Sequence, residues 1–116
     1  MSEIKIKRAY DPPAPDDGVR VLVDRLWPRG LKRSEAGVQT WLKEVAPSAE
    51  LRKWFGHDPA RWDEFQQRYR AELTANAALR VLRDLVRDNK RVTLLFAARD
   101  GEHNNAVVLR DVCRRR

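Results

Sequence analysis

The sequence contains one cysteine, Cys113, so the chain cannot form a disulfide bond within itself. It has no uninterrupted apolar run near the roughly 18 residues of a membrane span, and the start, MSEIKIKRAY, contains no apolar signal core. We therefore expect no membrane partner and a cytoplasmic location. Because 116 residues match the usual size of one domain, we expect a single domain over residues 1–116.

Several motifs that carry known chemistry are also missing. The chain has no Gly-x-Ser-x-Gly elbow and no glycine-rich phosphate loop. Its single cysteine falls on the apolar face of the last expected helix, which predicts a buried thiol rather than a nucleophile. Neither of the two histidines, His57 and His103, has a closely spaced His or Cys neighbour. We therefore expect no metal site and no cofactor.

What the chain does have is an excess of positive charge. Lys and Arg number 24 against 17 for Asp and Glu, a net charge of +7, which favours polyanions such as nucleic acid, phosphorylated metabolites or acidic proteins. Three of these charges belong to the run 114–116, which we expect to be a disordered basic tail. The surplus in the rest of the chain is ordinary, and genome base composition explains the many arginines equally well.

Three segments have the pattern of β-strands. Charged and apolar residues alternate over residues 4–10, which indicates an edge strand or a strand with one wet face. Three prolines and an Asp-Gly pair make residues 11–18 a loop. The more continuous apolar runs at 19–23 and 92–98 indicate interior strands.

Helical spacing fills most of the chain between the second and third of these strands. Ser34 is a fair N-cap for a helix that carries Val38, Trp41 and Val45 on one face and stops at Pro47. Further helices are expected from Ser48 to Trp54, from Pro59 to Leu73 with the stripe Trp62, Phe65, Tyr69 and Leu73, after the cap Asn76, and from Ala106 onward. The pattern predicts an α/β fold, a small three-stranded sheet packed with four to five helices. The sheet should be at least partly parallel, because a helical crossover joins the last two strands.

The third strand runs into a cluster of polar residues, FAARDGEHNN, just before the last helix. In open α/β sheets the strand-to-helix junction is where ligands bind, so we take Arg99, His103, Asn104 and Asn105 as candidate ligand-binding residues. One asparagine suffices to cap the helix, and the second amide is suited to recognition of a planar polar ligand. The alternative is that both amides only tie the turn to the helix.

The second strand also ends in polar residues, within VLVDRLWPRG. If the two strands are parallel neighbours, Asp24 and Arg25 emerge at the same sheet edge as the cluster above, and Arg29 follows in the turn. Asp24 is a candidate proton-transfer residue, and the two arginines are candidate ligand-binding residues. The alternative is that Asp24 forms a structural ion pair with an arginine.

His57, between a glycine and an aspartate, is the second candidate catalytic residue. Its imidazole is suited to act as a general acid or base near neutral pH if it lies beside the sheet edge. The alternative is a loop imidazole bonded to the backbone.

Three motifs in order resemble the YeaO-like family of small bacterial proteins, a family of unknown function: RVLVDRLWPRG, WLKEVAPSAELRKWFGHDP and LLFAARDGEHNNAVVL. The resemblance covers nearly the whole chain and implies a compact cytoplasmic α/β domain with no established reaction. A sister branch has a Cys-His-Arg triplet where this chain has Asn104, Asn105 and Ala106, so thiol chemistry does not carry over.

Two functions remain open from the sequence. The first is a pocket that binds a phosphorylated or nucleotide-like small ligand at the carboxyl ends of the strands, with or without a reaction. The second is a non-catalytic basic module that binds nucleic acid or an acidic protein. Arginines that converge in one concave pocket favour the first function, and a broad convex stripe favours the second. The oligomeric state is not predicted by either pattern.

Overall fold

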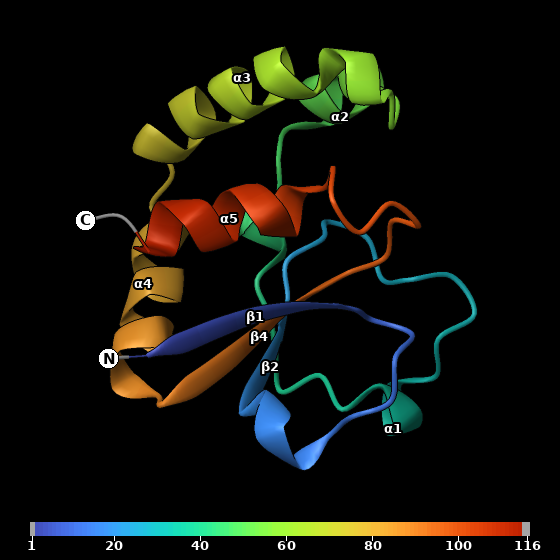
Figure 1. Ribbon diagram of the computed structural model, residues 1–116, viewed down its shortest axis with the longest axis vertical. Helices are drawn as coiled ribbons and strands as arrows, with labels where there is room; N and C mark the ends of the chain where they lie inside the picture. Colours follow the sequence, from blue (N-terminus) through green and yellow to red (C-terminus); the bar gives the residue numbers. More distant parts are fainter. Residues whose placement is uncertain (1, 115–116) are drawn as a thin grey trace.

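A computed structural model describes residues 2–114 of the chain (Figure 1). The strands in this part are β1 (Glu3–Arg8), β2 (Val19–Leu22), β3 (Thr40–Trp41) and β4 (Arg91–Phe96). The helices are α1 (Arg33–Ala36), α2 (Ala49–Phe55), α3 (Trp62–Thr74), α4 (Ala78–Asp88) and α5 (Asn105–Arg114). Short 3₁₀ turns lie at Pro15–Asp17, Lys43–Val45 and Pro59–Arg61. The α/β class and the expected number of helices are confirmed for the described residues.

The strands form one parallel sheet in the order β1-β4-β2-β3. Two of the expectations are confirmed: β1 is an edge strand, and β2 and β4 are parallel neighbours in the interior. Ile4 of β1 and Val19 of β2 both lie opposite Val92 of β4. The polar segments that follow β2 and β4 therefore leave the sheet at the same edge.

The sheet has four strands rather than three, and the long helix expected from Ser34 is wrong. The chain turns at Gly37, whose φ of 61° is left-handed, so α1 ends after one turn. Val38 and Trp41 then pack against one face of the sheet, whereas Val45 packs against the other. A single helix would place these apolar side chains on one face, so the 3.6-residue spacing was fortuitous.

The missed strand β3 is short and pairs with β2. The Gln39 N–H donates to the Arg20 carbonyl at 3.0 Å, and the Leu42 N–H donates to the Leu22 carbonyl at 2.9 Å. The Trp41 indole donates to the Asp24 carbonyl at 2.8 Å. These bonds satisfy the outer edge of β2 and fix the backbone where that strand ends.

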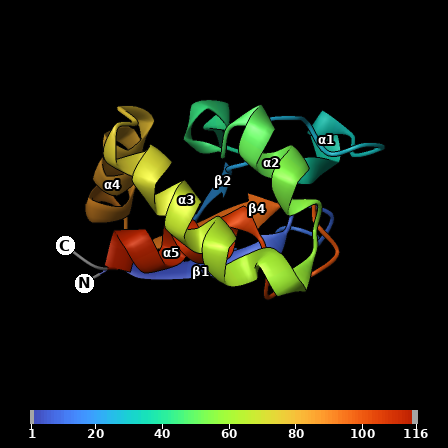
Figure 2. The ribbon, with the colours of Figure 1, turned by 90° about the horizontal axis from the view of Figure 1, so that it is seen from above.

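The larger helices cover one face of the sheet, as the two views of the ribbon show (Figures 1 and 2). α3 packs against α2 and α5, and α5 packs against β1 and β4. Phe65, Tyr69 and Leu73 of the predicted α3 stripe are buried, but Trp62 is only partly buried at its margin. The main core also contains Val21, Val23, Val92, Leu94, Leu82, Val108 and Leu109.

The expected helix starts are confirmed where a polar side chain accepts a hydrogen bond from the first turn. Ser48 accepts from the Leu51 N–H at 3.1 Å, and Asp58 accepts from the Ala60 N–H at 3.0 Å. Asn76 accepts from the N–H of Ala78, the first residue of α4, at 2.9 Å, although Ala77 holds the N-cap position. The Ser48 cap stabilises the start of α2 by about 1 kcal/mol.

The other face of the sheet is covered by loops, and a buried carboxylate fastens them. Asp17 is 1% exposed and accepts hydrogen bonds from Lys7 at 3.0 Å, Arg20 at 2.6 Å and the Ala14 N–H at 3.0 Å. Burial alone would raise the pKa of Asp17, but these donors hold it at about 2. The Thr93 hydroxyl donates to the Asp17 carbonyl at 2.7 Å, so the loop is tied directly to β4.

Arg114, which we expected in a disordered tail, is the last residue of α5, and its side chain donates to the Ile4 carbonyl at 3.3 Å. Arg115 and Arg116 lie outside the described residues. In the part of the chain that the structure covers, no helix has the length and apolar character needed to cross a membrane.

Candidate functional site

A pocket of about 630 Å³ lies where β2 and β4 end. Its walls come from the loop 24–29, from α2 and the residues after it, from the segment 97–98 and from the start of α5. Seven residues predicted from the sequence line it: Asp24, Arg25, Arg29, His57, His103, Asn104 and Asn105. The carboxyl ends of parallel strands thus bring together the two polar segments that are far apart in the chain.

Arg99 was predicted to share this site, but it does not line the pocket and is exposed. The segment that contains it turns away after Ala98. The Asp100 carboxylate fixes this turn, since one of its oxygens accepts from the Glu102 N–H at 2.9 Å and from the His103 N–H at 3.1 Å. The sequence placed Arg99 at the correct junction but did not show which side of the turn it occupies.

The pocket contains two cations that the sequence reasoning missed, Arg52 and Lys53 of α2. They join Arg25 and Arg29, so four cationic side chains line one cavity. Leu51 and Phe55 mark the buried side of α2 in the sequence, but no local signal shows that this helix lies over the strand ends.

These four cations have no partner among the residues that the structure describes. Within residues 2–114, none of the four forms an ion pair or donates a side-chain hydrogen bond. The Nε atoms of Arg25 and Arg52 are buried without a partner. The same is true of Arg20 and Arg110, which do not line the pocket, so the site is marked by its cationic charge rather than by the buried Nε atoms.

Asp24 connects the three segments that form the pocket floor. One carboxylate oxygen accepts from the Ala97 N–H at 2.9 Å, directly after β4. The other accepts from the Asn105 amide at 3.0 Å, at the first residue of α5. Burial raises the pKa of Asp24, and the two hydrogen bonds and the nearby charges of Arg52 and His57 only partly offset this. The structural ion pair considered for Asp24 is absent from the described residues, and neutral donors hold the carboxylate instead.

The two asparagines have different roles. Asn104 is the helix cap: its Oδ1 accepts from the Val107 N–H at 3.2 Å, and its amide donates to the Asp100 carbonyl at 2.9 Å. The Asn105 amide donates to the Val23 carbonyl at 2.9 Å as well as to Asp24. Both therefore tie the turn to neighbouring segments. Among the described residues, no group donates to Asn105 Oδ1, so one acceptor of the second amide remains at the pocket.

His103 is held in a fixed orientation. Its Nδ1 lies 2.8 Å from Asp100 Oδ2, and its ring meets the Trp62 ring edge-on with centroids 5.3 Å apart. Two backbone N–H groups and the His103 side chain lower the pKa of Asp100. The second ring nitrogen, Nε2, has no hydrogen-bond partner among residues 2–114 and stays available to a ligand.

His57 lies at the rim of the same pocket and is exposed. Its φ of 57° makes it the one non-glycine residue with a left-handed backbone in the described part of the chain. Such residues cost free energy and persist where the surrounding structure imposes them, often at functional sites.

The remaining wall of the pocket is aromatic and apolar. Trp27 packs edge-on against Trp41 with ring centroids 5.6 Å apart and donates to the Leu31 carbonyl at 2.7 Å. Tyr10 donates to the Arg29 carbonyl at 2.8 Å and so braces the loop that carries two of the cations. Leu26 lines the pocket although it is 67% exposed. The cavity thus combines cations with apolar lining residues.

The sequence also raised metal binding and covalent catalysis by Cys113. Among residues 2–114, no three His, Cys, Asp or Glu side chains gather as a metal-ligand set. Burial raises the pKa of the Cys113 thiol to about 11, so the nucleophilic thiolate is scarce near neutral pH.

With this geometry in view, comparisons place the chain among known proteins. A family model with the description "Inactive DUF488-N3 subclade" (DUF488-N3i) matches residues 3–116. The chain belongs to this family. The uncharacterized protein YeaO of Escherichia coli K12 is 41% identical over 109 residues, covering 93% of this chain and 94% of its own, so the YeaO-like resemblance is confirmed. The uncharacterized protein Rv3073c of Mycobacterium tuberculosis H37Rv is 45% identical over 108 residues, covering 93% of this chain and 91% of its own. No solved structure matches this DUF488-N3i chain.

Proposed function

We propose that this DUF488-N3i chain binds a phosphorylated, nucleotide-like small molecule in the pocket at the carboxyl ends of β2 and β4. The observation that carries the proposal is the convergence on one cavity of four cations from two segments, none of which forms an ion pair within residues 2–114: Arg25, Arg29, Arg52 and Lys53. A guanidinium group can bind phosphate through two parallel hydrogen bonds, each to a different oxygen, and this bidentate contact is stronger where water is excluded. The positive end of α5 also faces this cavity and favours an anion.

The rest of the wall supports a ligand with a planar, partly polar body. Leu26, Trp27 and Phe55 add apolar lining beside the cations, which suits a ligand with an apolar ring as well as an anionic group. Asn105 Oδ1 and His103 Nε2 are groups that a polar ring edge would contact. The expected ligand is therefore an anion joined to a ring, rather than inorganic phosphate alone.

We assign this pocket to binding rather than to a reaction. Asp24 and His57 were the residues expected to transfer a proton. Both carboxylate oxygens of Asp24 already accept hydrogen bonds from the protein, which makes this residue an organiser of the pocket. The family description, "Inactive DUF488-N3 subclade", supports the same assignment. His57 then lies at the rim as a polar group that a ligand can contact.

A thermal-shift panel tests the proposal. Nucleoside monophosphates and sugar phosphates are compared with the matching neutral nucleosides, and we expect only the phosphorylated members to raise Tm. A ligand at 100 times its Kd stabilises the native state by about 2.7 kcal/mol. Arg52→Gln should abolish the shift. Arg91→Gln is the matched control, because it removes the same charge at the amino end of β4.

Two outcomes would count against the pocket. Equal shifts for nucleosides and their phosphates would show that no anion is recognised. Equal losses of the shift in Arg52→Gln and Arg91→Gln would show that net charge, not this cavity, attracts the ligand. If a 12-nucleotide single-stranded DNA bound more tightly than every mononucleotide, with the same loss in both variants, the basic-module alternative would be favoured.

A further inference from the structure

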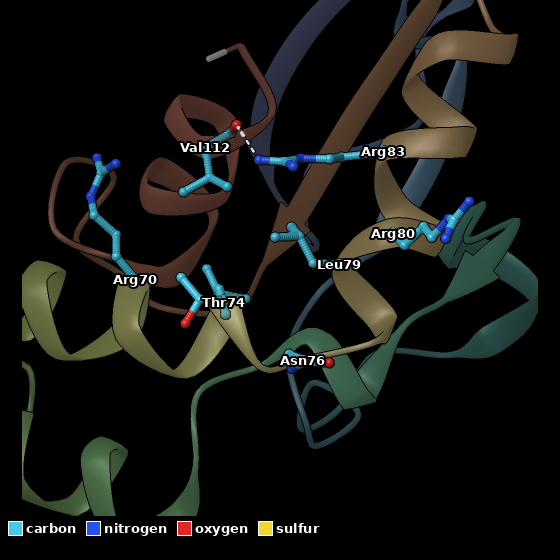
Figure 3. A pocket seen from close by; sticks show the side chains of 8 residues that line it. Arg70, Thr74, Asn76, Leu79, Arg80, Arg83 and Val112 are labelled. Carbon is cyan, nitrogen blue, oxygen red and sulfur yellow. Dashed lines mark hydrogen bonds between the residues drawn. The ribbon is translucent and has the colours of Figure 1, made fainter. Parts of the chain in front are cut away.

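A second pocket, of about 670 Å³, lies between the last turns of α3 and α5 and the first half of α4. It shares no lining residue with the pocket at the strand ends. Figure 3 shows Arg70 and Arg80 on opposite sides of it, with Leu79 between them and Arg83 directed toward α5. The two pockets lie at opposite ends of α5 and are separate sites.

The second pocket carries positive charge with little to balance it. Among residues 2–114, Arg80 forms no ion pair and no side-chain hydrogen bond. Arg83 donates only to the Val112 carbonyl, at 3.2 Å, and Arg70 lies 3.7 Å from Asp111. No Asp or Glu side chain lines the pocket, so the three arginines leave it electropositive.

The floor of this pocket is aliphatic. Leu73 and Leu79 are buried in the core beneath it, and Val112 closes one side. Asn76 already has partners, because its amide donates to the Glu44 carbonyl at 2.8 Å and its Oδ1 accepts from the Ala78 N–H at 2.9 Å. No aromatic side chain lines the pocket, so it offers no surface on which a base could stack.

We propose that this second pocket binds an acidic peptide segment of a partner protein, with one apolar side chain on the aliphatic floor and a carboxylate on either side. Arginines on opposite walls suit two separate carboxylates along an extended peptide better than one compact phosphate. An apolar anchor within a charged rim is the usual organisation of a protein interface. The site is distinct from the proposed ligand pocket and does not depend on it.

The test begins without an assumed sequence. A random 12-residue phage-display library is selected on the full chain, and the enriched peptides are synthesised with a fluorescent label for anisotropy titrations. We expect the enriched peptides to share an apolar residue flanked by Asp or Glu. Replacement of that apolar residue by Ser should weaken binding at least tenfold.

Matched variants locate the binding site. Arg80→Gln should weaken binding of the selected peptide at least fivefold. Arg87→Gln removes the same charge two turns further along α4, outside the pocket, and should change Kd less than twofold. Arg52→Gln, in the pocket at the strand ends, should also leave peptide binding unchanged, which separates the two proposals. All three side chains lie at least partly at the surface, and unchanged Tm values verify folding.

The proposal is overturned if no peptide is enriched, or if the enriched peptides lack the acidic and apolar pattern. Equal weakening by Arg80→Gln and Arg87→Gln would attribute binding to net charge. If a 12-nucleotide single-stranded DNA displaces the peptide at a lower concentration than the unlabelled peptide does, the surface binds nucleic acid instead.

Discussion

Two aspartates, Asp17 and Asp24, are held in the fold in different ways, and their pKa values move in opposite directions. Asp17 meets the cations Lys7 and Arg20, and its pKa is about 2. Asp24 meets a backbone N–H and an amide, and burial raises its pKa. The Ala14 N–H is the strongest of the groups that lower the pKa of Asp17, and Lys7 and Arg20 add to it, whereas at Asp24 burial outweighs both donors. Asp17 therefore serves mainly stability, and Asp24 serves the geometry of the pocket.

The first prediction concerns Asp17 and pH. Its folded pKa of about 2 lies below the ordinary value of 3.8, so its contribution to stability is complete above pH about 4. As the pH falls toward 2, the unfolded chain takes up the proton first, and about 2 kcal/mol of stability is lost. Urea titrations between pH 5 and pH 2 measure this loss.

Asp17→Asn should remove most of the pH dependence in this window and lower the stability at pH 7. The neighbouring Asp16 is exposed and pairs with Lys5 alone, so Asp16→Asn is the control and should retain the loss. If Asp17→Asn and the wild-type chain lose stability in parallel, the buried carboxylate is not the cause.

The second prediction tests the left-handed backbone at His57. Glycine adopts this conformation freely, whereas an alanine there is strained by about 1 kcal/mol. His57→Gly should therefore be more stable than His57→Ala by about 1 kcal/mol in urea unfolding, although both lack the imidazole. Equal stabilities would show that the loop relaxes and that the site imposes no strain.

At the scale of elements, the sequence correctly predicts the helices and strands that have a single clear pattern. β2 and β4 are continuous apolar runs, and the caps Ser48, Asp58 and Asn76 precede clear helical patterns, so these elements are correct. The helix predicted for residues 34–45 is wrong because the spacing of Val38, Trp41 and Val45 fits two structures equally well. These side chains can share one face of a helix, or they can pack on the two faces of a sheet. The turn at Gly37 decides between them, and only the contacts of the folded sheet fix it.

The third prediction concerns the turn that leads into β2. Gly18 and Gly30 both have a left-handed φ, but a Cβ at Gly18 would lie 2.1 Å from the Arg91 carbonyl oxygen, whereas one at Gly30 would meet nothing within 4 Å. Gly18→Ala should be less stable than Gly30→Ala by at least about 2 kcal/mol, because the backbone of β4 must move. Similar melting temperatures for the two variants would contradict this close approach.

The fourth prediction concerns α3. Phe65 is 2% exposed and stacks on Phe55 with ring centroids 4.3 Å apart, whereas Trp62 is only partly buried. Phe65→Ala should cost about 3 to 5 kcal/mol of unfolding free energy, as aromatic core truncations do. Trp62→Ala should cost clearly less, although the removed side chain is larger. Denaturant titrations of the two variants decide, and the reverse order would show that Trp62 is the true anchor.

At the scale of the whole molecule, topology explains why part of the site was predictable. Parallel pairing of β2 and β4 brings Asp24 and Asn105 together. The helical crossover in the sequence predicted the parallel direction, and the site followed on the condition that the two strands are neighbours. Arg52 was beyond this reasoning, because its place depends on how α2 packs over the strand ends. Arg99 was misplaced for a similar reason, since the turn around Asp100 directs it outward.

The fold also determines where the positive charges gather. The net charge of +7 alone suggests a diffuse attraction to polyanions. The fold instead collects four cations in the pocket at the strand ends and three in the pocket between α3, α4 and α5. Concave sites focus the field of such charges, so we expect the positive potential to be strongest at these two pockets.

The most direct test of the central claim is a ¹H–¹⁵N NMR titration with the phosphorylated ligand that gives the largest thermal shift. The account predicts that the perturbed amides cluster at residues 24–29, 52–57, 97–98 and 103–105, and that this pattern disappears in Arg52→Gln. Perturbations confined to α4 and the end of α5, or spread evenly over the exposed arginines, would contradict it.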